Sequence, residues 1–126
     1  MNRYKPLWAL VLILLVTSCA KSNEEAERAE MGGAGNCNTT NMSYATDIAP
    51  ILQANCYACH SNANQSISGI SLEGHSNLKK VADDGRLIGV ITHAAGYPPM
   101  PQIGPKLSDC NINKIKSWVN SGSPNN

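Results

Sequence analysis

Two cysteines and a histidine are the residues of this 126-residue chain whose types and spacing are best suited to chemistry. Residues 55–62 read NCYACHSN, so Cys56 and Cys59 are three apart and His60 follows directly. Thiols and an imidazole at this spacing can bind zinc, form a redox-active dithiol, or attach a haem to the chain. Each use requires different partners elsewhere in the sequence.

The zinc and dithiol alternatives each lack a required partner. A structural zinc site takes four nitrogen or sulfur ligands, and the sequence has no second CxxC and no HxxxH motif. A thioredoxin-like dithiol opens a helix that follows a strand. Here the preceding residues 43–55 carry Ile48, Ile51 and Leu52 at helical spacing instead.

The haem alternative uses all three residues. Positions i, i+3 and i+4 of a helical turn share one face. Cys56 and Cys59 can therefore form thioethers with the two vinyl groups of one porphyrin, while His60 presents a ring nitrogen to its iron. CxxCH is the signature of c-type haem attachment. The sequence predicts one covalent haem c at Cys56 and Cys59, with His60 as an iron ligand.

The N-terminus is typical of an export signal. Residues 1–18 contain Arg3 and Lys5 and then ten consecutive apolar residues, 7–16, fewer than the roughly 20 that span a bilayer. Residues 16–19, VTSC, resemble the lipobox of bacterial lipoproteins. That resemblance implies cleavage before Cys19 and lipidation of its thiol; an ordinary secretory signal is the alternative. Both predict an extracytoplasmic chain, on the periplasmic side, where disulfides persist.

The rest of the chain divides into a linker and one domain. Residues 19–36 are charged and glycine-rich, which predicts a flexible tether after the lipidated cysteine. Residues 37–126 are then one domain. The formal net charge of +1 gives no basic footprint for nucleic acid. The sequence contains no Phe, so the domain has a modest core that a haem would help to fill.

The cysteine count predicts a disulfide. Of the five cysteines, Cys19 is assigned to the lipid and Cys56 with Cys59 to the haem. Cys37 and Cys110 remain, one near each end of the domain, and an extracytoplasmic pair of this kind is a disulfide candidate. Two unrelated free thiols are the alternative.

Hydrophobic periodicity and capping residues predict an all-α domain with four to five short helices. We expect helices at residues 43–55, 77–83 and 85–94, and a last helix of about residues 109–120. Expected N-caps are Thr46 or Asp47 for the first, Ser76 for the second, and Ser108 or Asp109 for the last. The last helix has the clearest apolar stripe: Ile112, Ile115, Trp118 and Val119.

From about Tyr44 to Gly122 the sequence resembles small single-haem c-type cytochromes. The resemblance is carried by CYACH (56–60), by YPPMP (97–101) and by the closing amphipathic helix. It implies a cytochrome c-like fold around one haem, with Met100 as the second axial ligand in a proline-stiffened loop. The other candidates for that position are Met31, Met42, His75 and His93; His93 is the runner-up and would make the iron bis-histidine.

What the resemblance implies about function is one-electron transfer rather than catalysis, since both axial positions of the iron would be filled. The lipid would hold this carrier at a membrane surface, where it would exchange electrons with redox proteins. Two alternatives stay open. An iron without Met100 could serve a gas sensor or a peroxidase-like enzyme, and the domain could be a fixed electron-entry subunit of a larger complex.

Overall fold

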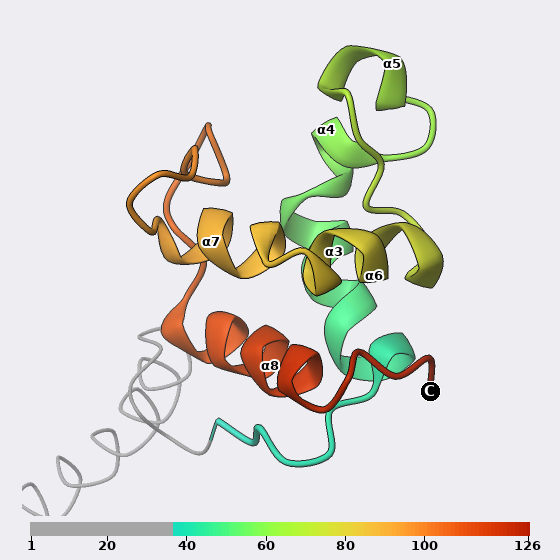
Figure 1. Ribbon diagram of the computed structural model, residues 1–126, viewed down its shortest axis with the longest axis vertical. Helices are drawn as coiled ribbons and strands as arrows, with labels where there is room; N and C mark the ends of the chain where they lie inside the picture. Colours follow the sequence, from blue (N-terminus) through green and yellow to red (C-terminus); the bar gives the residue numbers. More distant parts are fainter. Residues whose placement is uncertain (1–36) are drawn as a thin grey trace, which may run out of the picture. The chain divides into compact units, whose positions relative to one another are not determined.

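Residues 37–126 are the part of the chain that the computed structural model describes. The predicted signal peptide, Cys19 and the tether lie outside these residues. Within residues 37–126 all regular secondary structure is helical, so the prediction of an all-α domain is confirmed. The elements are η1 (Tyr44–Ile48), α3 (Ala49–Asn55), α4 (Tyr57–His60), α5 (Gln65–Ser68), α6 (His75–Asp83), α7 (Arg86–Thr92) and α8 (Asp109–Asn120) (Figure 1).

Four of these helices correspond to the predicted ones. α3, α6, α7 and α8 have 7, 9, 7 and 12 residues. The other three elements are short, and η1 is a π-helical turn that leads directly into α3. In Figure 1, α4 and α5 lie at the upper right and the long loop between α7 and α8 lies at the upper left, both above α6 and α7, and α8 lies below.

The N-cap predicted for the first helix is wrong. Neither Thr46 nor Asp47 caps it; Ser43 does, because its hydroxyl accepts a hydrogen bond from the Thr46 N–H at 3.4 Å. Asp47 instead accepts from the Ser43 N–H at 3.0 Å, which makes a reciprocal pair at the helix start. Pro50 lies in the first turn of α3 and has no N–H to donate.

The cap predicted for the second helix is also wrong, whereas the last is correct. α6 begins at His75, before Ser76, and follows Gly74, whose φ of 88° lets the chain turn without any side-chain cap. At α8, the Ser108 hydroxyl accepts from the Asn111 N–H at 3.2 Å. Of the two residues proposed for this position, Ser108 is therefore the N-cap.

The core lies between α3, α6, α7 and α8. The apolar stripe of α8 supplies Ile115 and Trp118, both fully buried. The Trp118 indole N–H donates to the Pro124 carbonyl at 2.9 Å, so its one polar group is satisfied. The fully buried side chains facing these two are Ile48, Leu52, Leu78 and Leu87. Burial of each such aliphatic side chain contributes about 1.5–3 kcal/mol.

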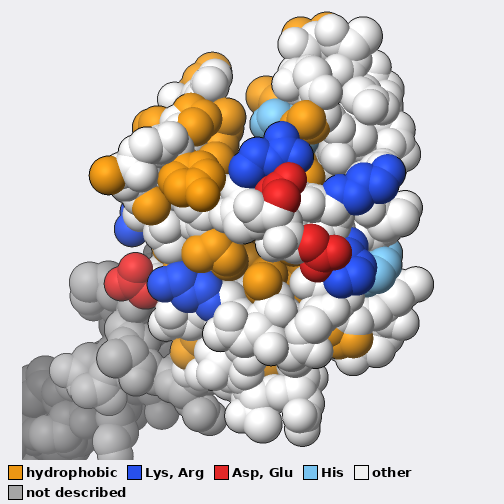
Figure 2. Space-filling view, in the orientation of Figure 1, with side chains coloured by type: hydrophobic (Ala, Val, Ile, Leu, Met, Phe, Trp, Pro, Cys, Tyr) orange, Lys and Arg blue, Asp and Glu red, His pale blue; other side chains and the backbone are white. Residues whose placement is uncertain are grey.

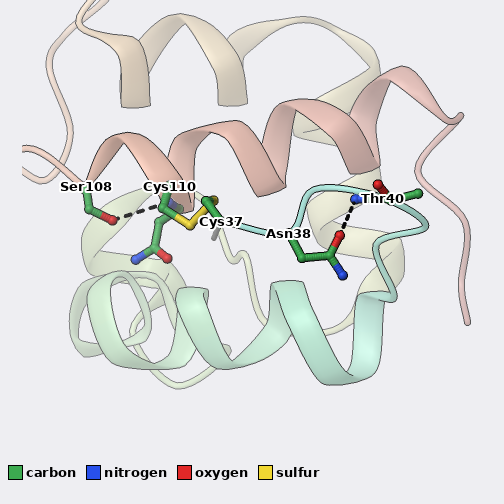
Figure 3. The surroundings of a disulfide bond; sticks show 6 residues. Cys37, Asn38, Thr40, Ser108 and Cys110 are labelled. Atoms are coloured by element: carbon green, nitrogen blue, oxygen red, sulfur yellow. Dashed lines mark hydrogen bonds between the residues drawn. A yellow bond between two sulfur atoms is a disulfide. The ribbon is translucent and has the colours of Figure 1, made fainter. Parts of the chain in front are cut away.

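The predicted disulfide is present between Cys37 and Cys110, which are 73 positions apart (Figure 3). It joins the first described residue to the first turn of α8. The same segment is held further along α8, where the Ser117 hydroxyl donates to the Thr39 carbonyl at 2.6 Å. The alternative of two free thiols is therefore wrong for this pair.

Within residues 37–126, helix length and hydropathy rule out a membrane-spanning helix.

Candidate functional site

The CxxCH motif lies at a break between two helices. α3 ends at Asn55, and Cys56 leaves helical geometry with φ −126° and ψ −37°. The chain then makes one more turn, α4, in which the His60 N–H donates to the Cys56 carbonyl at 2.8 Å. The sequence predicted a helical turn at Cys56–His60. The structure has this turn, and the break at Cys56 separates it from α3.

A cavity of about 930 Å³ opens beside this turn, at the upper end of the usual range for ligand pockets. Cys56, Cys59 and His60 line it from one side. Met100 lines it from the loop between α7 and α8, although it lies 40 positions after His60 in the chain. The structure thus brings all four residues predicted to hold the cofactor to one cavity.

The remaining wall is mainly apolar. Leu72, Val81, Leu87, Ile91 and Leu107 are buried side chains that belong to the core and also line the cavity. Figure 2 shows the surface hollowed between two lobes, with hydrophobic side chains gathered mostly on one of them.

Arg86 is the only Lys or Arg among the lining residues, and its guanidinium pairs with Asp84 at 2.7 Å. This pair lowers the pKa of Asp84 through the Arg86 hydrogen bonds.

The ring of His60 is oriented by a backbone carbonyl. Its Nδ1 lies 3.4 Å from the Ile70 carbonyl oxygen. Because a carbonyl can only accept, this contact places the proton on Nδ1 and leaves the Nε2 lone pair available to a metal. The segment between α4 and α6 is held near His60 by a hydrogen bond from the Leu72 N–H to the His60 carbonyl at 2.8 Å. Sequence reasoning did not foresee the role of Ile70, because a backbone acceptor leaves no trace in side-chain patterns.

The two motif thiols differ in environment. Cys56 is half-buried and Cys59 is exposed, and both are free thiols. Burial, with a smaller contribution from Cys59, raises the pKa of the Cys56 thiol from 9.0 to about 11. Cys56 is therefore protonated at neutral pH, a form that reacts slowly with electrophiles and oxidants.

The other candidates for a second axial ligand lie elsewhere. Met42 is a buried core residue and is 4% exposed. His75 packs edge-on against Tyr44 and Trp118, with its Nε2 2.9 Å from the Ser123 carbonyl. His93 is exposed, and its Nε2 is occupied by the Met100 carbonyl at 3.0 Å.

None of Met42, His75 and His93 lines the cavity. Met31 lies outside the described residues. Of the described candidates, Met100 alone therefore shares the cavity with His60.

Two further features of residues 37–126 bear on the alternatives. No group of three or more His, Cys, Asp and Glu side chains in this range is placed to hold a metal ion, so the geometry gives no support to a zinc site at CYACH. A second hollow of about 470 Å³ is lined by residues 39–42, 117, 121, 124 and 126, which include no cysteine or histidine.

Comparison of the chain with protein-family models, curated proteins and solved structures gave no match. The assignment of the site is based on its residues and their placement.

Proposed function

We propose that residues 37–126 are a cytochrome c-like domain that carries one covalent haem and transfers single electrons. The observation that carries this proposal is the shared cavity of Cys56, Cys59, His60 and Met100. Its volume and its mainly apolar wall suit a large, flat, apolar group. When bound, the haem supplies a one-electron ferric–ferrous couple.

Each residue of the site has a distinct task. Cys56 and Cys59 would hold the porphyrin by thioether bonds. His60 would bind the iron through Nε2, with its ring direction set by the Ile70 carbonyl. Met100 would fill the opposite position, and a thioether ligand there favours the ferrous iron and raises the reduction potential. With the haem bound, the apolar wall would limit contact of water with the iron, so that little would rearrange on electron transfer.

The test is an optical spectrum of the purified haem-loaded protein, oxidised and reduced, with and without carbon monoxide. A low-spin spectrum that carbon monoxide does not change, with a far-red band from methionine bound to ferric iron, supports the His60–Met100 assignment. Rapid carbon monoxide binding by the native protein would refute the closed site and favour the gas-sensor or peroxidase-like alternative.

Met100→Ala, with Met42→Ala as its control, identifies the residue responsible. We expect Met100→Ala to abolish the far-red band, admit carbon monoxide and lower the reduction potential. Met42→Ala removes a methionine that is buried in the core and does not line the cavity. It should lower the unfolding free energy by about 2–5 kcal/mol and leave the spectrum unchanged. An unchanged spectrum in Met100→Ala would rule out Met100 as the ligand.

The proposal also includes attachment to a membrane outside the cytoplasm, through a lipid on Cys19. Support comes from the sequence of residues 1–19. Detergent phase partitioning tests it: the native protein should enter the detergent phase, and a chain that starts after Cys19 should stay in the aqueous phase. Partitioning of both into the aqueous phase would exclude the lipid anchor.

Redox proteins are the proposed partners. Ile67 and Ile103 both line the cavity, and they are 85% and 90% exposed. This apolar rim is a suitable contact area for a redox protein. A membrane pull-down separates a carrier, whose partners exchange, from a fixed subunit that co-purifies with one complex.

A further inference from the structure

The backbone of Met100 is held at both of its polar groups by the end of α7. Its N–H donates to the Val90 carbonyl at 3.0 Å, and its carbonyl accepts from Nε2 of His93, also at 3.0 Å. Both partners lie within one turn of each other. Both polar groups of the Met100 backbone are thus hydrogen-bonded to the C-terminal end of α7.

These two hydrogen bonds are important for the position of Met100 because the residues beside it can make few other backbone hydrogen bonds. Pro98, Pro99 and Pro101 surround Met100, and proline has no N–H to donate. Within residues 98–101 the Met100 N–H is therefore the only backbone donor, and it is used. Loss of the His93 bond would leave the Val90 bond and the stiff proline backbone to hold Met100 in position.

His93 itself occupies an unusual backbone position. It ends α7 with φ 58° and ψ 41°, in the left-handed region. Helices that end in this conformation usually place glycine there, as α5 does with Gly69 at φ 78°. A side chain with a β-carbon is disfavoured in this region. Histidine adopts this region more often than most other residues do, and at His93 the conformation occurs together with the bond to Met100.

The hydrogen bond also defines the state of the ring. Because the Met100 carbonyl accepts, Nε2 of His93 carries the proton and donates. His93 does not line the cavity, so it acts on the site only through Met100.

We infer that His93 is a positioning residue, whose Nε2–H holds the Met100 carbonyl so that the thioether stays in the cavity as the ligand opposite His60. This inference rests on the proposed function. It predicts that His93 controls how readily an external ligand displaces Met100, although His93 touches neither the cavity nor its contents.

The experiment measures the affinity of imidazole for the ferric, haem-loaded protein. Loss of the far-red methionine band reports the binding. His93→Gly removes the donor while keeping a residue that suits left-handed backbone. We expect imidazole to bind about two- to tenfold more tightly than to the native protein, the factor that loss of one net hydrogen bond produces. His93→Gln restores an amide donor of similar reach and should return the affinity toward the native value.

His75→Ala is the matched control. It removes a histidine whose Nε2 makes an equivalent bond, 2.9 Å from the Ser123 carbonyl, away from the loop. It should lower stability and leave the imidazole affinity unchanged. If His93→Gly does not fold, His93→Asn gives the same comparison, because asparagine tolerates the left-handed region and its amide is too short to reach Met100.

An imidazole affinity in His93→Gly or His93→Asn that matches His75→Ala would overturn the inference, as would tighter binding that His93→Gln does not reduce. A native protein without the far-red band would instead refute the proposed function before any His93 variant is compared. The two failures are therefore distinguishable.

Discussion

At the scale of single residues, the candidate site combines side chains that line the cavity with neighbouring groups that hydrogen-bond to these residues and fix their orientation. The Ile70 carbonyl selects the tautomer of His60, and His93 holds the carbonyl of Met100. Cys56 owes its raised pKa mainly to its own burial. The identity of each chemical group is written in the sequence, but its protonation depends on neighbours that the fold supplies.

The raised pKa of Cys56 predicts slow alkylation of the folded, haem-free chain. A pKa of about 11 in place of 9.0 leaves about a hundredfold less thiolate at pH 8, because each unit is a factor of ten. Iodoacetamide should therefore modify Cys56 far more slowly in native buffer than in denaturant, as followed by peptide mass spectrometry. The native rate should increase up to about pH 11. Equal rates in the two conditions would contradict the burial argument.

At the scale of elements, α7 and the loop that follows it form the support for Met100. The ring of Tyr97 lies against the helix backbone at Gly89, so closely that a β-carbon there would be 2.5 Å from the ring carbons. Further along, the Ala94 N–H donates to the Gly89 carbonyl at 3.0 Å. The glycine is therefore required by close packing and not by backbone conformation.

This packing predicts a change of sign in a double-mutant cycle. Gly89→Ala should lower the unfolding free energy by about 1–3 kcal/mol, because the Tyr97 ring must move. In a Tyr97→Ala background the same change should be neutral or stabilising by up to about 1 kcal/mol, since alanine is the better helix former. Denaturant unfolding of the four proteins measures the coupling. Additive effects would show that the ring and the glycine do not interact.

The element predictions succeeded where a repeating pattern existed. The apolar stripes located α3, α6, α7 and α8 to within a few residues, because a buried helix face repeats every three to four positions. The single turns α4 and α5 have no such repeat, and α5 was not foreseen. The caps failed at Thr46, Asp47 and Ser76, because the first helical segment begins earlier, where Ser43 caps it, and α6 begins after Gly74 without a side-chain cap.

At the scale of the whole domain, the Cys37–Cys110 disulfide closes a loop that contains nearly every other described element. The C-terminus returns to the start of the same loop, where the Ala45 N–H donates to the Asn126 carbonyl at 3.0 Å. With a small core and no Phe, a covalent link of this length has a large effect on the unfolded chain.

Replacement of both cysteines, Cys37→Ala with Cys110→Ala, should lower the unfolding free energy by about 4 kcal/mol, as loop-closure entropy predicts for 73 positions. Guanidinium unfolding of the haem-loaded protein, followed by circular dichroism, measures the difference. Reduction of the native protein under the same conditions should reproduce it. A loss below about 1 kcal/mol would mean that the unfolded chain is not restricted by the bridge.

The sequence by itself determined the features that depend on residue identity and short spacing: the CYACH motif, the helical class of the domain and the pairing of Cys37 with Cys110. Only the tertiary structure decided that Met100 lines the cavity with His60, and that Met42, His75 and His93 do not. The physical reason is the distance along the chain over which a sequence pattern is informative. Periodicity reports on neighbours within one or two helical turns, whereas the path that returns Met100 to His60 is set by packing across the whole domain.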